Sequence, residues 1–178
     1  EDLIKRNSQG LLRLVNQMLD LAKLESGHLE LEQRQADVVP YIQYLFESFE
    51  SYAASTNIHL HFHKETTDLF MDFDENRLES ILSNLLSNAI KFSPKDFGHI
   101  VIEIKQELKK PKITIKDNGK GLSDSEIEKI KELKSFSNTG SDSEKGFGIG
   151  LFLTNEFLRQ NDAFLDVKNN ELGGAEFS

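Results

Sequence analysis

The stretch NLLSNAIKFSP, from Asn84 to Pro94, pairs a strong helix pattern with residues that a helix does not need. Its apolar residues recur at helical spacing and Pro94 ends the run, so the stretch predicts a helix. Asparagine is a mediocre helix former, because its side chain competes for backbone hydrogen bonds. Even so, Asn84 and Asn88 lie four residues apart and Lys91 follows three residues later. These spacings place all three polar side chains on one face of the helix.

This polar face has the chemistry of a site for a phosphorylated ligand. An amide oxygen is a suitable ligand for Mg²⁺, which also binds the phosphates of a substrate. A lysine one turn away adds a positive charge for those phosphates. The alternative is a surface helix on which the amides are incidental, and the helix alone leaves that alternative open.

A second motif, DNGKGLS, runs from Asp117 to Ser123 directly after the strand pattern ITIK. Gly119 and Gly121 at the end of a strand allow the backbone to come close to a ligand. A carboxylate there can accept a hydrogen bond from an exocyclic amine, which would select adenine. The alternative is an Asp-Asn-Gly hairpin turn. A polar helix pattern follows in place of a second strand, which favours the ligand site.

A third motif, GFGIGL, contains Gly146, Gly148 and Gly150 and opens a helix pattern, with Lys145 directly before it. Free backbone amides at a helix N-terminus form an anion site. The motif lacks the Gly-Lys-Ser/Thr ending of a P-loop and does not follow a strand, as a dinucleotide fingerprint would. Alone it is weak evidence.

The composition limits the classes of function. The 178 residues are 38% hydrophobic with 13 Phe, which is enough for one domain and an appendage. A net charge of −9 argues against a nucleic-acid surface. There is no cysteine, and hence no disulfide or thiolate metal site. No apolar run approaches the roughly 18 residues of a membrane helix, and no signal peptide is present.

The first 28 residues predict one long helix of a helical bundle. Ile4, Leu11 and Met18 are spaced by seven, as are Leu14 and Leu21. With a second apolar stripe beside the first, so wide an apolar face needs neighbours on two sides. We expect these partners from another segment or another copy, and we expect a longer parent protein.

The remainder predicts an α+β sandwich, with one sheet and helices on one face. Alternation predicts an antiparallel pair before and after a turn at 109–111, and a capping box at Ser123 and Glu126 opens a short polar helix. The small polar residues of 135–146 predict a mobile loop. The expected strands are 28–35, 58–63, 69–73, 99–108, 111–117, 163–167 and 175–178, and the expected helices are 39–54, 74–93, 123–135 and 147–160.

In this order, the three motifs resemble the N, G1 and G2 boxes of the sensor histidine kinase ATP-binding domain. That domain has the Bergerat-type two-layer α/β sandwich shared with DNA gyrase, MutL and the heat-shock chaperone ATPases. The stretch LLRLVNQMLDLAKLESG resembles the second helix of the kinase dimerisation domain, and GGAEFS resembles the start of the last family box. The resemblance therefore implies a dimerisation helix over 1–28 and an ATP-binding catalytic domain over 29–178.

The resemblance also implies roles for the motif residues. Asn84 and Asn88 would face Mg²⁺ and the triphosphate, with Asn88 the better candidate for direct coordination, and Lys91 would reach phosphate. Asp117 would accept from adenine. The residues so assigned to ATP and Mg²⁺ are Asn84, Asn88, Lys91, Asp117, Gly119, Gly121, Lys145, Gly146, Gly148, Gly150 and Leu151.

The implied reaction is transfer of the ATP γ-phosphoryl to a histidine, for relay to a response-regulator aspartate. The implied partners are a second copy, the dimerisation helix and a receiver domain, with no nucleic acid. The implied location is a cytoplasmic domain of a protein anchored in the inner membrane. None of the five histidines fits the acceptor position. Two rivals remain, a water-directed ATPase and a non-enzymatic binding module. Asparagine is a poor base, so Asn84 argues against the first, and the intact motif residues argue against the second.

Overall fold

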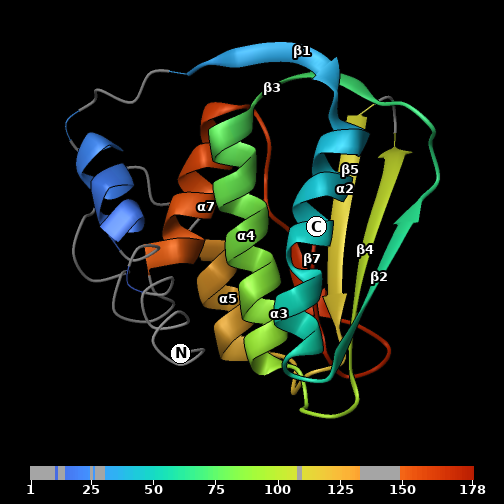
Figure 1. Cartoon of the computed structure of the whole chain (residues 1–178). Helices are drawn as coiled ribbons and strands as arrows, with labels where there is room; N and C mark the ends of the chain where they lie inside the picture. The colour runs from blue at the N-terminus through green and yellow to red at the C-terminus, as the bar shows by residue number, and fades with distance from the viewer. Residues whose placement is uncertain (1–10, 12–14, 25, 27–30, 108–109, 133–148) are drawn as a thin grey trace.

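An open five-stranded sheet forms one layer of the fold, and helices cover one face of it (Figure 1). The computed structural model describes residues 11, 15–24, 26, 31–107, 110–132 and 149–178. Neighbouring strands are antiparallel except for the first pair, which is parallel. In sheet order the strands are β2 (Ile58–Lys64), β4 (Gly98–Glu107), β5 (Lys110–Asp117), β7 (Ala175–Phe177) and β6 (Val167–Asn169).

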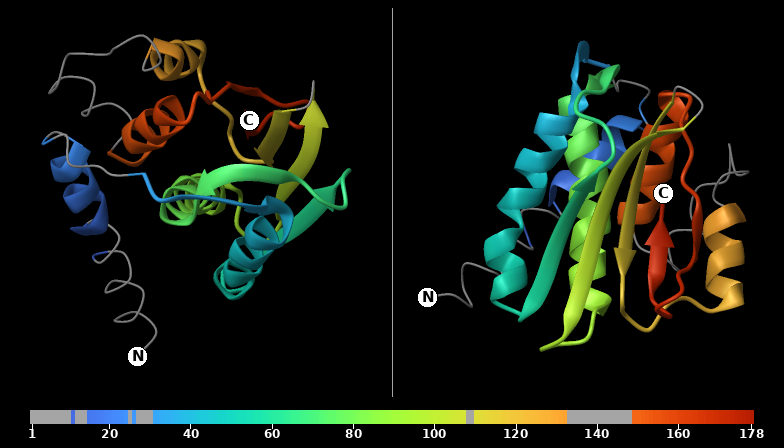
Figure 2. Two further views of the ribbon diagram at one scale, coloured as in Figure 1. Left: turned by 90° about the horizontal axis from the view of Figure 1, so that it is seen from above. Right: turned by 90° about the vertical axis from the view of Figure 1, so that its right-hand side faces the viewer.

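The helical layer lies against this sheet, and a separate two-stranded ribbon crosses one end of the molecule (Figures 1 and 2). The ribbon pairs β1 (Gln33–Asp37) with β3 (Phe70–Asp74) in antiparallel register. The helices are α2 (Val38–Ser48), α3 (Glu50–Ala54), α4 (Glu75–Phe92), α5 (Asp124–Glu132) and α7 (Ile149–Gln160).

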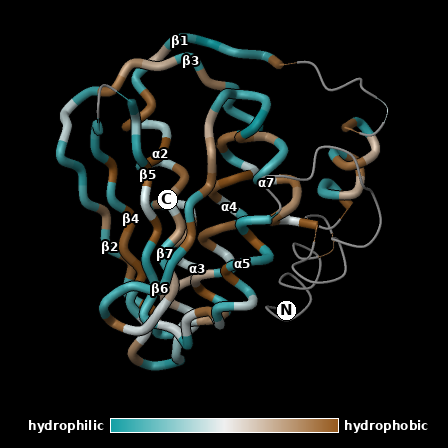
Figure 3. The backbone as a smooth tube through the Cα atoms, turned by 180° about the vertical axis from the view of Figure 1, so that it is seen from behind, coloured by the Kyte–Doolittle hydropathy of each residue, from teal (hydrophilic) through white to brown (hydrophobic). Residues whose placement is uncertain are grey.

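The core lies between the sheet and the helices because alternate strand residues point to one face. On β4, Ile100, Ile102 and Ile104 are fully buried, while the residues between them are more exposed. From the helical side, the fully buried side chains of Leu86 on α4 and Phe157 on α7 belong to the same cluster. Figure 3 shows hydrophobic segments on the strands and helices that meet in this interior.

Two carboxylates fix the starts of the long helices. The side chain of Asp74 accepts from the amide of Arg77 and so caps the N-terminus of α4. Asp37 caps α2 through Val39, and the same oxygen accepts from the amide of Leu69. The position of α4, which carries the asparagines, is therefore tied to the end of β3.

Most predicted elements are confirmed. The α+β class, the single helical layer, the antiparallel β4–β5 pair and the capping box are all present, the last through a bond of 2.8 Å from the Ser123 amide to Glu126 Oε2. His59, His61 and His63, which alternate along β2, are exposed. Among the described residues, no three His, Cys, Asp or Glu side chains could hold a metal ion.

Three boundaries in the sequence analysis are wrong. The helix predicted over 39–54 is two helices, because the Phe49 amide bonds to the carbonyl of Phe46 and breaks the regular pattern. The strand predicted over 163–167 begins only at Val167, because Ala163 still bonds back to Leu158 at the end of α7. The strand predicted over 28–35 is β1, which begins at Gln33 and pairs with β3 outside the main sheet.

A helical segment over 15–24 lies beside the helical layer (Figure 2). Leu21 and Leu24 pack against the core, whereas Val15, Met18 and Leu19 are exposed at 44%, 61% and 55%. The helix therefore keeps an apolar face that nothing in the described chain covers. The part of the chain that the structure describes holds no helix long and apolar enough to cross a membrane.

Candidate functional site

Asp117, the last residue of β5, is buried and only one of its two carboxylate oxygens is committed. Oδ1 accepts hydrogen bonds from the amides of Gly119 at 2.8 Å and Ala175 at 3.1 Å. Oδ2 takes none from the described residues. Burial raises the pKa of the Asp117 carboxyl, and the two amides offset part of that rise. Two hydrogen bonds thus orient the side chain, and Oδ2 remains available to accept from a ligand.

The loop after Asp117 is packed closely enough to require its glycines. A Cβ on Gly119 would lie 2.5 Å from the carbonyl oxygen of Phe92, so the loop touches the end of α4. Gly121 has a φ of +67°, which favours glycine, and a Cβ there would also collide with the carbonyl of Gly173. The structure therefore brings the first two motifs into contact and gives both glycines a packing role.

An aromatic residue from the apolar pattern of the first motif lies at this contact. Phe92, the last residue of α4, is 49% exposed. The ammonium groups of Lys91 and Lys120 lie 5.1 and 5.7 Å from its ring centre. The sequence indicates Phe92 only by its position at the end of the helix, where the apolar face no longer packs against the core. Two cations and one accessible ring suit a ligand with a flat base and phosphates.

The two asparagines of α4 have different surroundings. Asn84 is buried, and its Nδ2 donates to Thr154 Oγ1 of α7 at 3.1 Å. Asn88 is half-buried, and its amide makes no hydrogen bond to the described residues. Asn84 is therefore part of the α4–α7 contact, while the amide of Asn88 is available to a ligand.

Gly150 also belongs to the α4–α7 contact. A Cβ at this position would collide with the side chain of Asn84. Leu151 is buried with the core residues of α7, so only its backbone could contact a ligand. Lys145, Gly146, Gly148 and the loop predicted over 135–146 lie outside the described residues.

Replacing Gly150 with alanine is expected to lower the free energy of unfolding by about 1–3 kcal/mol, because the added methyl group overpacks the contact with Asn84. In an Asn84→Ala background the colliding amide is gone, so the same replacement should cost less. Urea unfolding of the four proteins in this cycle measures the difference. Stabilisation by Gly150→Ala in the otherwise unchanged chain would contradict the close contact.

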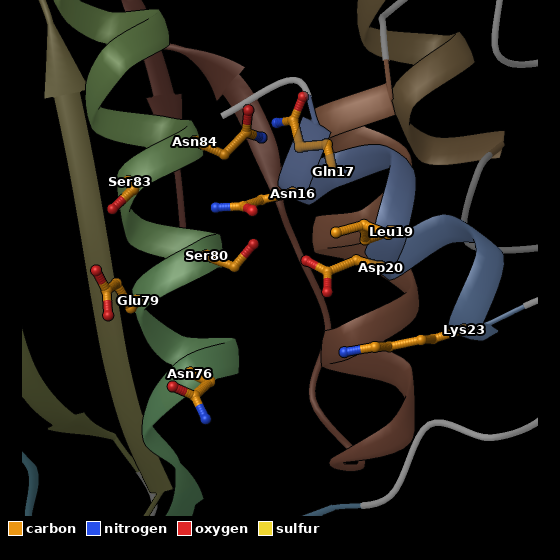
Figure 4. Close-up of a pocket in the computed structure, with 10 residues that line it drawn as sticks. All are labelled: Asn16, Gln17, Leu19, Asp20, Lys23, Asn76, Glu79, Ser80, Ser83 and Asn84. Carbon is orange, nitrogen blue, oxygen red and sulfur yellow. The ribbon is translucent and has the colours of Figure 1, made fainter. Parts of the chain in front are cut away.

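A polar pocket of about 450 Å³ separates α4 from the 15–24 helix (Figure 4). Asn84 lies at its wall, so the pocket opens beside the asparagine face of α4. Burial raises the pKa of Asp20 on the facing helix, and Lys23 and Arg77 lower it in part. The lining residues are Asn16, Gln17, Leu19, Asp20, Lys23, Asn76, Glu79, Ser80, Ser83 and Asn84.

The side chains of this site suit Mg²⁺ only when the metal is bound together with a phosphorylated ligand. The amide oxygen of Asn88 is uncommitted, and the described residues contain no group of three His, Cys, Asp or Glu side chains that could hold a metal ion. Mg²⁺ is commonly held by one or two protein oxygens together with substrate phosphates and water. The donor set therefore fits a metal that arrives with its ligand.

Comparisons with known proteins identify the family of this chain. A family profile described as histidine kinase-, DNA gyrase B-, and HSP90-like ATPase matches residues 73–178. Histidine kinase P4 of Formosa agariphila is 28% identical over 98% of this chain and 13% of that protein. Sensor histidine kinase TmoS of Ectopseudomonas mendocina is 32% identical over 99% of this chain and 18% of that protein. The chain therefore spans less than a fifth of the length of these curated relatives.

Solved structures share the fold. The nucleotide-free catalytic domain of histidine kinase ThkA superposes with a TM-score of 0.68 at 22% identity, covering 83% of this chain and 93% of that one. Histidine kinase AdeS of Acinetobacter baumannii has a TM-score of 0.72 at 20% identity, covering 99% and 80%. Because the profile spans more than half of the sequence and the relatives are sensor kinases, the chain belongs to the histidine kinase-, DNA gyrase B- and HSP90-like ATPases, as an ATP-binding catalytic domain of the sensor histidine kinase type.

Proposed function

We propose that this domain binds Mg²⁺-ATP and transfers the γ-phosphoryl group to a histidine supplied by another segment or chain, for relay to a receiver aspartate. The observation that carries the proposal is the Asp117 carboxylate. Its Oδ1 is held by two backbone amides and its Oδ2 is open. An acceptor fixed in this way favours a purine with an amine at position 6, as in adenine, over one with a carbonyl there.

The neighbouring side chains suit the rest of the nucleotide. The exposed ring of Phe92 offers a stacking surface for the base beside Asp117. Lys91 lies one turn beyond Asn88 on α4 and carries charge for phosphate. Lys120, in the loop after Asp117, lies over the same ring and adds a second cation.

Asn88 is the residue we propose to bind Mg²⁺ directly, because its amide is uncommitted. Asn84 supports the site indirectly, because its hydrogen bond to Thr154 holds α7 against α4. Lys145, Gly146, Gly148 and Gly150 are proposed to bind phosphate at the start of α7, with the backbone of Leu151 beside them. When bound, Mg²⁺ supplies charge neutralisation for the transferring phosphoryl group.

The reaction that we propose is transfer to histidine and not hydrolysis. A ring nitrogen of the acceptor forms a bond to the γ-phosphorus, the bond to the bridging oxygen breaks, and ADP leaves. Hydrolysis at this position needs a base to activate water, and the amide of Asn84 is a poor base. Its Nδ2 is also committed to Thr154.

The segment over 1–28 is proposed to be the second helix of a dimerisation domain, and 29–178 the catalytic domain. The exposed Val15, Met18 and Leu19 support a helical partner, which we take to be a second copy. The relatives are several times longer than this chain. We propose a cytoplasmic position in a parent protein anchored in the inner membrane.

Calorimetric titration with ATP and ITP in the presence of Mg²⁺ tests the proposal. ITP carries a carbonyl where ATP carries the 6-amino group, so it should bind at least about tenfold more weakly. GTP, which has the same carbonyl, should behave like ITP. Equal affinity for the three nucleotides would overturn the assignment of Asp117.

A further inference from the structure

Two adjacent asparagines, the last residue of β6 and the residue that follows it, hold the two ends of the loop that carries Asp117. The loop runs over 117–122, and Asn169 and Asn170 follow it by about fifty positions in sequence. Asn169 bonds to Leu122 at the far end of the loop, and Asn170 bonds to Asp117 at the near end. Neither residue belongs to the three glycine and asparagine motifs of the sequence analysis.

Asn169 makes a paired contact with one residue. Its Nδ2 donates to the carbonyl of Leu122, and its Oδ1 accepts from the amide of Leu122, both at 2.8 Å. A Cβ on the preceding Gly121 would lie 2.8 Å from the same Oδ1. The side chain therefore occupies the space that a glycine leaves open, and both backbone groups of Leu122 are satisfied by it.

Asn170 connects Asp117 to the turn before β7. Its Nδ2 donates to the carbonyl of Asp117 at 2.7 Å and to that of Ala175 at 3.1 Å. Its Oδ1 accepts from the amides of Leu172 at 2.9 Å and Gly174 at 3.2 Å. The acceptor half of this amide thus forms the turn, and the donor half fastens the turn to Asp117.

We propose that Asn170, assisted by Asn169, is a positioning residue that sets where the open oxygen of Asp117 lies and so determines selection of the base. The Ala175 amide is one of the two donors that hold Asp117 Oδ1. Asn170 bonds to the carbonyls of both residues, so it fixes the distance between the carboxylate and its donor. The inference rests on the proposed binding of adenine at Asp117.

The test is the ratio of the ITP and ATP dissociation constants in the 178-residue chain. Asn170→Asp keeps the acceptor oxygen that forms the turn and removes the donor to Asp117. We expect this variant to lower the ratio about tenfold, because it loses one hydrogen bond that orients Asp117. ATP and ITP carry the same charge, so the ratio cancels long-range effects of the added carboxylate.

Asn170→Ala is expected to lower the ratio as far, with an added loss of thermal stability. Asn169→Ala should act in the same direction but about threefold, since this residue is exposed and its bonds compete with water. Asn161→Ala is the matched control. Its amide also donates to a backbone carbonyl, that of Phe157, but at the end of α7 away from the loop.

An unchanged ratio in folded Asn170→Asp would overturn the positioning role, whatever happens to stability. A ratio that also falls in Asn161→Ala would overturn it as well. If the unaltered chain binds ATP and ITP equally, the proposed reading of adenine fails and the inference fails with it. If it prefers ATP and Asn170→Asp keeps that preference, only the inference fails.

Discussion

The Asp117→Asn variant is expected to exchange the preference for ATP for a preference for ITP. The asparagine oxygen can accept from Gly119 and Ala175 as Oδ1 does now. Its NH₂ group would then occupy the position of Oδ2. There it opposes the amine of adenine but can donate to the carbonyl of hypoxanthine. Affinity for ATP should fall by about 1–3 kcal/mol, which is roughly five- to 150-fold.

The nucleotide-free Asp117→Asn protein should be at least as stable as the unaltered chain at neutral pH. The raised pKa of Asp117 means that its ionised form is disfavoured in the folded state. The contribution of the Asp117 carboxyl to stability is therefore fully present below its pKa in the unfolded state. It is lost as pH rises through its pKa in the folded state. The stability of Asp117→Asn relative to the unaltered chain should increase as pH rises between these two pKa values and stay constant above them. Thermal unfolding of both proteins from pH 3 to pH 7, in steps of about one pH unit, measures this difference in stability.

Asp37→Asn is the matched control. Its Oδ1 likewise accepts from two backbone amides, those of Val39 and Leu69, but at the start of α2. It should leave the preference between ATP and ITP unchanged. Retained selectivity for ATP in Asp117→Asn would show that the base is read elsewhere.

Local patterns account for what the sequence could predict of the fold. Alternation along β4 and β5 is visible in the chain because one face of each strand is buried. The caps at Asp74 and Ser123 are equally local, since each acts on an amide three residues away. These features need no knowledge of the rest of the molecule.

What the sequence could not predict depends on contacts between distant segments. The pairing of β1 with β3 joins residues about forty positions apart. The contact of Gly150 with Asn84 spans a still larger gap in sequence, so the sequence suggested only phosphate binding at Gly150, and the structure adds a packing reason for the glycine. Asn170 gave no signal, because an asparagine after a short strand is ordinary and its partner lies 53 residues earlier.

The second large effect expected is the loss of phosphoryl transfer in trans on replacing Asn88. The chain should phosphorylate a histidine on a separate, longer chain that carries a complete dimerisation domain and a catalytic domain with an inactivated nucleotide site. It should not label itself, because four of its histidines lie at β2 and the start of β4 and not on a helix. The label on the acceptor should be labile to acid and stable to base.

Asn88→Ala removes the uncommitted amide that we propose as the protein ligand of Mg²⁺, and with it the charge neutralisation that the metal would supply to the transferring group. Transfer should fall about 100-fold, while Asn161→Ala should transfer normally. Labelled ATP and gel autoradiography measure the rate, with released phosphate counted in parallel. Acid-stable label on this chain would indicate a serine, threonine or tyrosine acceptor and contradict the assignment. Phosphate release without a labelled acceptor would favour the water-directed ATPase, because it would mean that water is activated despite an amide at position 84.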